Sequence, residues 1–215
     1  MHIFLYVPNI IGYVRAVFMI LSWNDALSNP NRFLVFYAIS YSLDMADGLA
    51  ARTLNQWSKF GAVLDMVLDR VSTASLFAIL ASIYPHHAIY FYVLLGLDLG
   101  SHWLQVTTTY SKGNNSHKGD DPDENFFVKI YYKSKAVLTL TCACAEYCGC
   151  ALYCLGNKET MWLFDFHIIN ILFYISLIGF VYKQFINIIQ IKTSSQRLVD
   201  ADMDQPQEGN TRKAL

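Results

Sequence analysis

The sequence predicts an all-α integral membrane protein, a bundle of six transmembrane helices. Hydrophobic residues make up 54% of the 215 residues, and the mean hydropathy is +0.28. This composition is too apolar and too aromatic for an ordinary soluble domain of this size. The apolar residues also gather in stretches long enough to cross about 30 Å of hydrocarbon at about 1.5 Å per helical residue. These stretches cover approximately residues 4–22, 33–52, 60–84, 86–106, 134–155 and 161–191.

Proline and polar segments mark the breaks between the stretches. Pro30, Pro85 and Pro122 fall between neighbouring stretches, where a missing amide hydrogen does little harm. We therefore expect one membrane domain over residues 1–192. Beyond this domain the sequence shows no periodicity and has little to bury, so residues 193–215 are predicted to form a disordered cytosolic tail.

The distribution of basic residues predicts the orientation in the membrane. If the N-terminus is cytosolic, the second-to-third connection, the fourth-to-fifth connection and the C-terminal segment are cytosolic too, and they hold most of the basic residues. The opposite side holds Arg32 and Lys158. The positive-inside rule then places both termini in the cytosol. The net charge of −1 gives no polybasic surface, so nucleic acid is not an expected partner. The cytosolic basic residues are Lys59, Lys112, Lys118, Lys129, Lys133, Lys135, Lys192 and Arg197.

Four aspartates lie inside the second and third apolar stretches. Asp44 and Asp47 are three residues apart and share one face of the second helix, while Asp65 and Asp69 are four apart and share one face of the third. The connection between these helices is short, so we expect antiparallel neighbours that bring all four side chains to one membrane edge. An ionised carboxylate in or near hydrocarbon is costly unless it is paired or bound to a cation. The cluster is therefore predicted to bind a metal ion through oxygen ligands.

Other residues inside the stretches are interpreted as packing residues. Gly48, Ala51 and Gly61 are small enough to let backbones, or a bulky ligand, approach closely. Asp98 and Glu146, in the fourth and fifth stretches, are expected to make hydrogen bonds between helices rather than to contact a ligand. Five cysteines crowd the fifth stretch, but their spacing and odd number favour small packing residues over a metal or disulfide site. They are Cys142, Cys144, Cys148, Cys150 and Cys154.

The pattern D-x2-D-G-x2-A-R-x8-G-x3-D-x3-D, which runs from Asp44 to Asp69, resembles at every fixed position the signature of the CDP-alcohol phosphotransferases. These membrane enzymes exchange the CMP of a CDP-activated lipid or alcohol for another hydroxyl. In the alternative interpretation the acids merely form buried polar contacts between helices. Charge argues against it, because Arg52 and Arg70 cannot neutralise four carboxylates, and an unpaired buried charge is strongly unfavourable.

The resemblance implies a role for each aspartate. Asp44, Asp47 and Asp65 would surround one divalent ion, and Asp65 and Asp69 a second. Asp69 would also be the catalytic base that takes the proton of the acceptor. The residue pattern alone supports the cluster but does not identify the base. Nor does it choose between Mg²⁺ and Mn²⁺, which both accept oxygen ligands in near-octahedral geometry.

The resemblance also implies positions that bind the substrate. Gly48 would allow close approach of the backbone to the nucleotide, and the guanidinium group of Arg52 would donate hydrogen bonds to a phosphate group. Ser58 sits where related sequences have a hydroxyl near the CDP-lipid, although a serine that caps a helix is an equal alternative. Asn9 and Arg15 belong to a segment similar to the family's first helix, which lies beside the nucleotide.

Three short motifs after the signature resemble the eukaryotic phosphatidylinositol synthases of this family. This resemblance implies that CDP-diacylglycerol is the donor and free myo-inositol the acceptor, with phosphatidylinositol and CMP as products. It also implies a homodimer in the lipid of the endoplasmic reticulum membrane, with the active site at the cytosolic end. Six polar side chains of the motifs are candidate inositol contacts: Ser101, His102, His117, Lys118, Tyr132 and Lys135. The motifs are Ser101-His102-Trp103, Ser116-His117-Lys118 and Tyr131-Tyr132-Lys133-Ser134-Lys135.

Three alternative functions remain open at this point. Another enzyme of the same family would use serine or glycerol 3-phosphate as acceptor, or would combine CDP-choline or CDP-ethanolamine with diacylglycerol. A divalent-cation transporter would also place acids in membrane helices, but it would need them at several depths along a route. A lipid-binding or scaffold protein without catalysis is disfavoured because all four aspartates of the signature are present.

Overall fold

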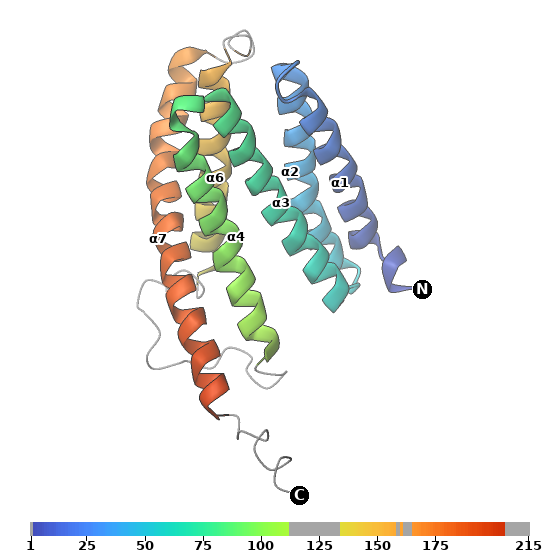
Figure 1. Ribbon diagram of the computed structural model, residues 1–215. Helices are drawn as coiled ribbons and strands as arrows, with labels where there is room; N and C mark the ends of the chain where they lie inside the picture. Colours follow the sequence, from blue (N-terminus) through green and yellow to red (C-terminus); the bar gives the residue numbers. More distant parts are fainter. Residues whose placement is uncertain (1, 112–133, 158–159, 161–164, 205–215) are drawn as a thin grey trace, which may run out of the picture.

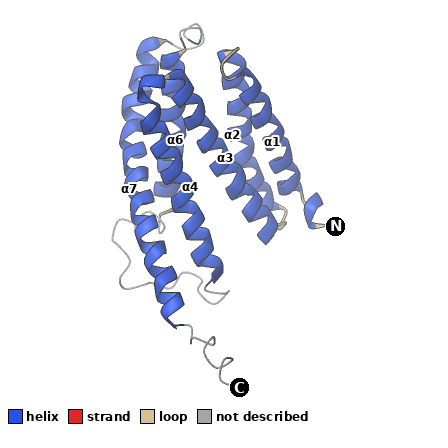
Figure 2. Ribbon diagram, viewed as in Figure 1, coloured by secondary structure: helices blue, strands red, loops and turns tan. Residues whose placement is uncertain are grey.

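The computed structural model describes residues 2–111, 134–157, 160 and 165–204. All regular elements in this part of the chain are helical, as the sequence predicts (Figure 2). Two of them are short 3₁₀ helices, η1 (Ile3–Leu5) and η2 (Pro85–His87). The long helices are α1 (Val7–Asp25), α2 (Pro30–Thr53), α3 (Lys59–Ile83), α4 (Ala88–Ser111), α6 (Lys135–Gly156) and α7 (Phe166–Asp204).

The helices form an elongated bundle in which α3 is central (Figure 1). The α1 helix packs along α2 on one side, while α4, α6 and α7 form the other side. The α3 helix contacts α1, α4 and α6. The C-terminal end of α2 and the N-terminal ends of α1 and α3 meet at one end of the bundle (Figure 1). This end carries the aspartates.

The apolar core lies toward the opposite end. Phe33 of α2 and Tyr153 of α6 are fully buried, and their ring centroids are 4.2 Å apart. Leu76 and Leu80 of α3 pack in the same cluster. The Tyr153 hydroxyl donates a hydrogen bond of 2.7 Å to the carbonyl of Ala26, so the polar tip of this core residue is satisfied. The core holds α2, α3 and α6 together and leaves the other end free for a polar site.

Caps and prolines explain where the helices begin. Asn29 and Ser58 cap α2 and α3 by accepting hydrogen bonds from backbone amides two to three residues into each helix. Pro30 is the first residue of α2 and Pro85 the first of η2. Proline is tolerated at the first position of a helix, because the amide hydrogen that it lacks would have no partner within the helix. The breaks predicted at these two prolines are confirmed, while Pro122 lies outside the described residues.

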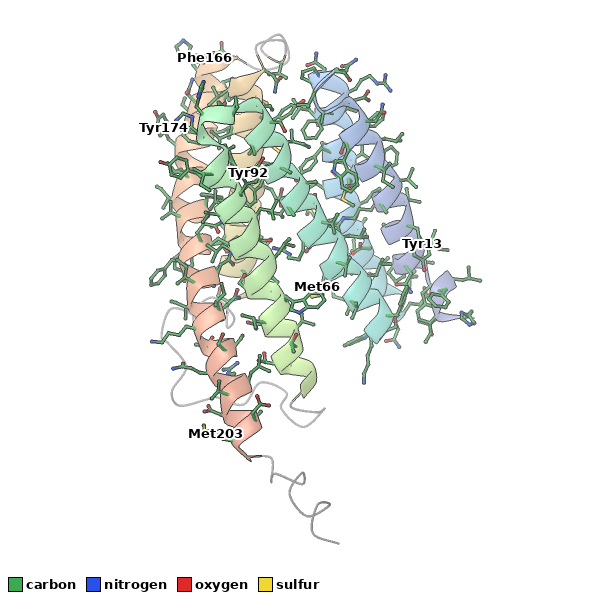
Figure 3. The ribbon with its side chains drawn as sticks, viewed as in Figure 1. Tyr13, Met66, Tyr92, Phe166, Tyr174 and Met203 are labelled. Carbon is green, nitrogen blue, oxygen red and sulfur yellow. The ribbon has the colours of Figure 1, made fainter. Side chains whose placement is uncertain are left out.

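The helices fit a membrane protein. Among the described residues, α3, α6 and α7 each contain an 18-residue window apolar enough to cross a bilayer. Large apolar and aromatic side chains project from the outer faces of the bundle (Figure 3). Tyr92 is 57% exposed and Tyr174 65% exposed, which is expected of side chains that face lipid rather than water. A membrane-embedded, all-helical fold is therefore supported. The count of six membrane spans remains a prediction.

The C-terminal helix α7 is longer than the sequence predicts. The α7 helix continues to Asp204, so residues 193–204 are helical and the tail predicted from residue 193 begins later than expected. Ser194 in this extension is 1% exposed, so at least one polar side chain beyond the predicted end of the helix is buried. The remaining tail, residues 205–215, lies outside the described residues.

The cysteines of α6 contribute to the packing between helices, as predicted. All five are free thiols on α6, and Cys148 is 1% exposed. Gly179 of α7 faces Cys144 so closely that an added Cβ would lie 2.6 Å from the cysteine Cβ. Small residues on both helices therefore allow α6 and α7 to approach each other closely.

Candidate functional site

The aspartates converge at the end of the bundle where α2 ends and α3 begins. Asp44 and Asp47 of α2 and Asp65 of α3 each offer an oxygen atom, and these atoms lie within 4.8 Å of one another. Asp69, one turn further along α3, joins them through a shared arginine. Carboxylate oxygens this close repel one another unless a cation lies among them, and they are the ligands that Mg²⁺ and Mn²⁺ prefer. The described residues thus fit a divalent metal site.

Arg15 of α1 supplies the positive charge at this site. Its Nη1 atom lies 2.5 Å from Asp44 Oδ1 and 3.1 Å from Asp65 Oδ1, and its Nη2 atom pairs with Asp69 Oδ1. The side chain is only 3% exposed. The sequence signature does not include this residue. Its place in the first apolar stretch and the resemblance of that segment to the family's first helix were the only signals.

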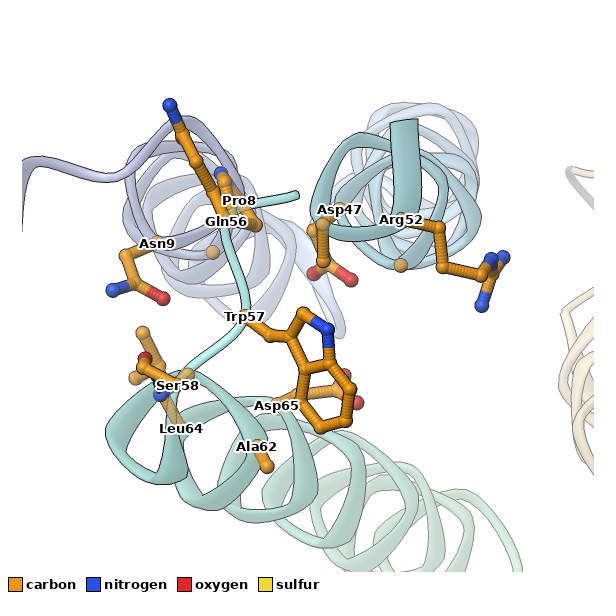
Figure 4. Close-up of a pocket in the computed structure, with 14 residues that line it drawn as sticks. Pro8, Asn9, Asp47, Arg52, Gln56, Trp57, Ser58, Ala62, Leu64 and Asp65 are labelled. Atoms are coloured by element: carbon orange, nitrogen blue, oxygen red, sulfur yellow. Dashed lines mark hydrogen bonds between the residues drawn. The ribbon is translucent and has the colours of Figure 1, made fainter. Parts of the chain in front are cut away.

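A pocket of about 350 Å³ opens beside the carboxylates (Figure 4). Asp47 and Asp65 form part of its wall, together with the predicted substrate-binding residues Gly48, Arg52 and Ser58. The structure therefore brings the three predicted positions and two of the predicted metal ligands to one cavity. A pocket of this volume suits a polar headgroup of small-molecule size, whereas the acyl chains of a lipid would remain in the bilayer.

Gly48 and Arg52 form one side of the pocket. They are separated by one helical turn of α2, and a Cβ added to Gly48 would lie 3.6 Å from Arg52 Nη1. Arg52 extends from α2 away from Asp47 (Figure 4). The guanidinium can therefore meet an anionic group in the pocket, because it is not drawn into the aspartate cluster as Arg15 is.

The connection between α2 and α3 forms another side of the pocket. The Ser58 hydroxyl accepts a 3.0 Å hydrogen bond from the Gly61 amide, so Ser58 is the cap of α3 and also lines the pocket. Trp57 lines the pocket with an indole that is 75% exposed (Figure 4). Gln56 Oε1 accepts a 2.8 Å hydrogen bond from the amide of Val7, which ties this connection to the start of α1. The sequence analysis assigned no role to Gln56 or Trp57, which lie in the eight-residue spacer of the signature between Arg52 and Gly61.

Gly61 is required by close contact between α1 and α3. A Cβ at this position would lie 2.7 Å from Asn9 Oδ1. Asn9 is 2% exposed and held by a 2.6 Å hydrogen bond from its Nδ2 atom to the Ile3 carbonyl, so it cannot easily move away. We expect Gly61→Ala to destabilise the protein by about 1–3 kcal/mol through overpacking. Thermal unfolding of the detergent-solubilised protein measures this cost.

Gly96→Ala is the matched control for this substitution. A Cβ at Gly96 meets nothing within 4 Å, and the residue lies inside α4. Alanine favours the helix over glycine by about 1 kcal/mol, so this variant should unfold at the same or a higher temperature than the unmodified protein. Equal stability of the two alanine variants would show that the contact between Gly61 and Asn9 is not tight.

A second polar network lies deeper in the bundle. Arg70 Nη1 of α3 is 2.9 Å from both carboxylate oxygens of Asp98 of α4, and Lys183 Nζ of α7 is 3.5 Å from Asp98 Oδ1. Arg70 Nη2 also lies 3.8 Å from Asp69 Oδ2. Asp98 is 1% exposed and Lys183 2% exposed. The prediction that Asp98 connects helices is confirmed, and Arg70 links this network to the aspartate cluster.

Glu146 also connects helices, as predicted. Its carboxylate accepts hydrogen bonds of 2.5 Å from the Tyr37 hydroxyl of α2 and 2.6 Å from the Thr73 hydroxyl of α3. Of the candidate inositol contacts, Ser101 and His102 bond within α4, since both side chains lie within 3.0 Å of the Asp98 carbonyl. The side chains of the other candidates, His117, Lys118, Tyr132 and Lys135, lie outside the described residues.

Comparison with known proteins identifies similar sequences over almost the whole chain. The family model described as CDP-alcohol phosphatidyltransferase matches residues 5–182. The CDP-diacylglycerol–inositol 3-phosphatidyltransferase of Candida albicans is 39% identical, over 94% of this chain and 84% of its own length. The enzymes of the same name from Saccharomyces cerevisiae and Homo sapiens are 37% and 36% identical, over 97% and 94% of this chain and 93% and 94% of their own lengths. No solved structure matches.

Proposed function

The chain belongs to the CDP-alcohol phosphatidyltransferase family, and on this premise we propose that it transfers the phosphatidyl group from CDP-diacylglycerol to myo-inositol. The products are phosphatidylinositol and CMP. The names of the relatives from two fungi and from humans support the choice of substrates. The single structural observation that carries the proposal is the convergence of Asp44, Asp47 and Asp65 beside a pocket that also contains Gly48 and Arg52.

The four aspartates are the proposed ligands of two divalent ions, Mg²⁺ or Mn²⁺. Asp44, Asp47 and Asp65 would hold one ion, and Asp65 and Asp69 the other. When bound, such ions stabilise the negative charge that develops on a diphosphate as its bond breaks. The hard oxygen ligands and the mutual closeness of three of the aspartates support this assignment.

The reaction is a displacement at the phosphorus atom that carries diacylglycerol. The inositol hydroxyl oxygen forms the new bond to phosphorus, and the bond to the bridging oxygen breaks, so that CMP leaves with the electron pair. Asp69 is the proposed base, which takes the hydroxyl proton. Its carboxylate is 33% exposed, so an acceptor can reach it, while its contacts to Arg15 and Arg70 fix its orientation.

The remaining pocket residues would bind the nucleotide side of the donor. Gly48 lets the diphosphate approach the α2 backbone, and Arg52 donates to phosphate from one turn further along. Ser58 would place its hydroxyl next to the lipid headgroup while it caps α3. The exposed indole ring of Trp57 also forms part of the wall of this pocket.

The setting that we propose is a homodimer in the endoplasmic reticulum membrane with the pocket facing the cytosol. The excess of basic residues on the predicted cytosolic side supports the orientation. The resemblance to eukaryotic phosphatidylinositol synthases supports the organelle and the dimer. A cation transporter is a weaker alternative, because the deeper acids Asp98 and Glu146 are held in contacts between helices and do not continue a route from the cluster.

The experiment that tests this function is incorporation of radiolabelled myo-inositol into lipid. Purified protein receives CDP-diacylglycerol with Mn²⁺ or Mg²⁺, and parallel reactions contain excess serine or glycerol 3-phosphate. We expect metal-dependent labelling that the competing alcohols do not reduce. Turnover with another alcohol but not with inositol would keep the reaction class and overturn the acceptor. Absence of CMP release with every acceptor would overturn the enzyme function.

A further inference from the structure

Arg15 lies against three of the aspartates that are proposed to bind metal. One guanidinium contacts Asp44, Asp65 and Asp69, and in each case the contact is to the Oδ1 atom. These are three of the four proposed metal ligands. The arginine and a divalent ion would therefore bind to the same carboxylate groups.

Contacts to α2 and α3 fix the backbone around Arg15, but one hydrogen-bond donor of its side chain has no partner among the described residues. The Arg15 carbonyl accepts a 3.2 Å hydrogen bond from the Ser40 hydroxyl of α2, and Gly12, one turn earlier, faces Leu64 of α3 at 3.2 Å from the position of an added Cβ. In contrast, the buried Nε atom of Arg15 has no hydrogen-bond partner among the described residues. The contacts to the aspartates therefore leave one donor of the side chain unsatisfied among the described residues.

The charges show that Arg15 alone does not satisfy the cluster. If all four carboxylates are ionised, as metal binding requires, they carry four negative charges, and Arg15 supplies one positive charge. Arg70 adds a contact only to Asp69, at 3.8 Å, and its closer partner is Asp98. The cluster keeps a negative excess that would attract divalent cations, although the three oxygens facing Arg15 are already in use.

We propose that Arg15 is a place-holding cation, which orients Asp44, Asp65 and Asp69 before metal binds and competes with metal for their oxygen atoms. This inference rests on the proposed metal-dependent function. In the metal-free protein, Arg15 prevents mutual repulsion of the carboxylates. Metal binding breaks at least part of these contacts, so the guanidinium lowers the affinity for the metal while it preserves the arrangement of the ligands.

The sign of one measurement separates this role from a structural one. If Arg15 were only a structural support, its removal would disorder the ligands and weaken metal binding. If it competes with the metal, its removal strengthens metal binding even though the metal-free protein becomes less stable. Opposite changes in metal affinity and in metal-free stability are therefore the expected signature.

The test compares Arg15→Met with the unmodified full-length protein in detergent. Free Mn²⁺ is measured by electron paramagnetic resonance during a titration, and thermal unfolding is recorded in EDTA and in saturating Mn²⁺. We expect half-saturation of Arg15→Met at an Mn²⁺ concentration about tenfold lower than that of the unmodified protein. Its unfolding temperature should fall in EDTA and recover in Mn²⁺. Arg32→Met, which removes a 60% exposed arginine at the other end of the bundle, is the control for the titration and should leave the Mn²⁺ midpoint unchanged.

Arg15→Lys keeps the test decisive if the methionine variant does not fold without metal. Lysine retains the charge but lacks the fork that contacts three carboxylates, so its half-saturation should lie between those of the other two proteins. An unchanged or higher Mn²⁺ midpoint in either variant would overturn the role of Arg15 alone. No Mn²⁺ binding by the unmodified protein would overturn the metal site itself, and this inference with it.

Discussion

Asp69→Asn is expected to reduce CMP formation by roughly 10²- to 10⁴-fold, the range associated with loss of a general base. Asparagine has nearly the same shape as aspartate but cannot accept the hydroxyl proton. It also removes one of the negative charges that face Arg15 and the proposed metal site. Initial rates with saturating CDP-diacylglycerol and myo-inositol measure the loss.

Asp202→Asn is the control for charge loss elsewhere. Asp202 is exposed near the C-terminal end of α7, far along the chain from the aspartate cluster, and its substitution should leave the rate unchanged. Asp69→Asn should also unfold at a temperature close to that of the unmodified protein, because Arg15 keeps Asp44 and Asp65 as partners and Arg70 keeps Asp98. A rate within tenfold of the unmodified enzyme would show that another group takes the proton.

Asp98→Asn is expected to cause the largest loss of stability, roughly 3–5 kcal/mol. The substitution leaves Arg70 and Lys183 as two cations in the bundle interior without the carboxylate that faces both. Lys183→Met should cost only about 1 kcal/mol, because it leaves Arg70 and Asp98 as a balanced pair. Thermal unfolding of the two variants under identical detergent conditions tests this difference.

The double variant Asp98→Asn with Lys183→Met provides a further control. Removing the lysine together with the aspartate eliminates one of the two unpaired cations, so the double variant should be more stable than Asp98→Asn alone. If Lys183→Met were as damaging as Asp98→Asn, or if the double variant were the least stable, the buried lysine would be contributing packing and not a surplus charge.

The sequence predicted that the aspartates of the candidate site lie close together, because helical spacing places them. Asp44 and Asp47 must share a face, as must Asp65 and Asp69, whatever the rest of the bundle does. Asp44, Asp47 and Asp65 do converge. Two of them, Asp47 and Asp65, line one pocket together with Gly48, Arg52 and Ser58. The roles assigned to them remain proposals, but their proximity was predictable from local geometry and a short connection.

Other features could not be predicted from local sequence. The end of α7 was predicted about a dozen residues too early, because a polar composition does not show that Ser194 is buried. Ser101 and His102 were candidate inositol contacts, yet both bond to the carbonyl of Asp98 one turn earlier. Side-chain partners within a helix depend on rotamers and neighbours, which a sequence motif does not specify.

The sequence by itself determined a helical membrane protein with four aspartates at the facing ends of two consecutive helices, because helix periodicity and hydrophobic length are local properties. Only the tertiary structure showed that a third helix places Arg15 among these aspartates, and that Arg70 connects them to Asp98 and Lys183. Such contacts join residues far apart in the chain. They depend on how α1, α3, α4 and α7 pack, and no local pattern encodes that packing.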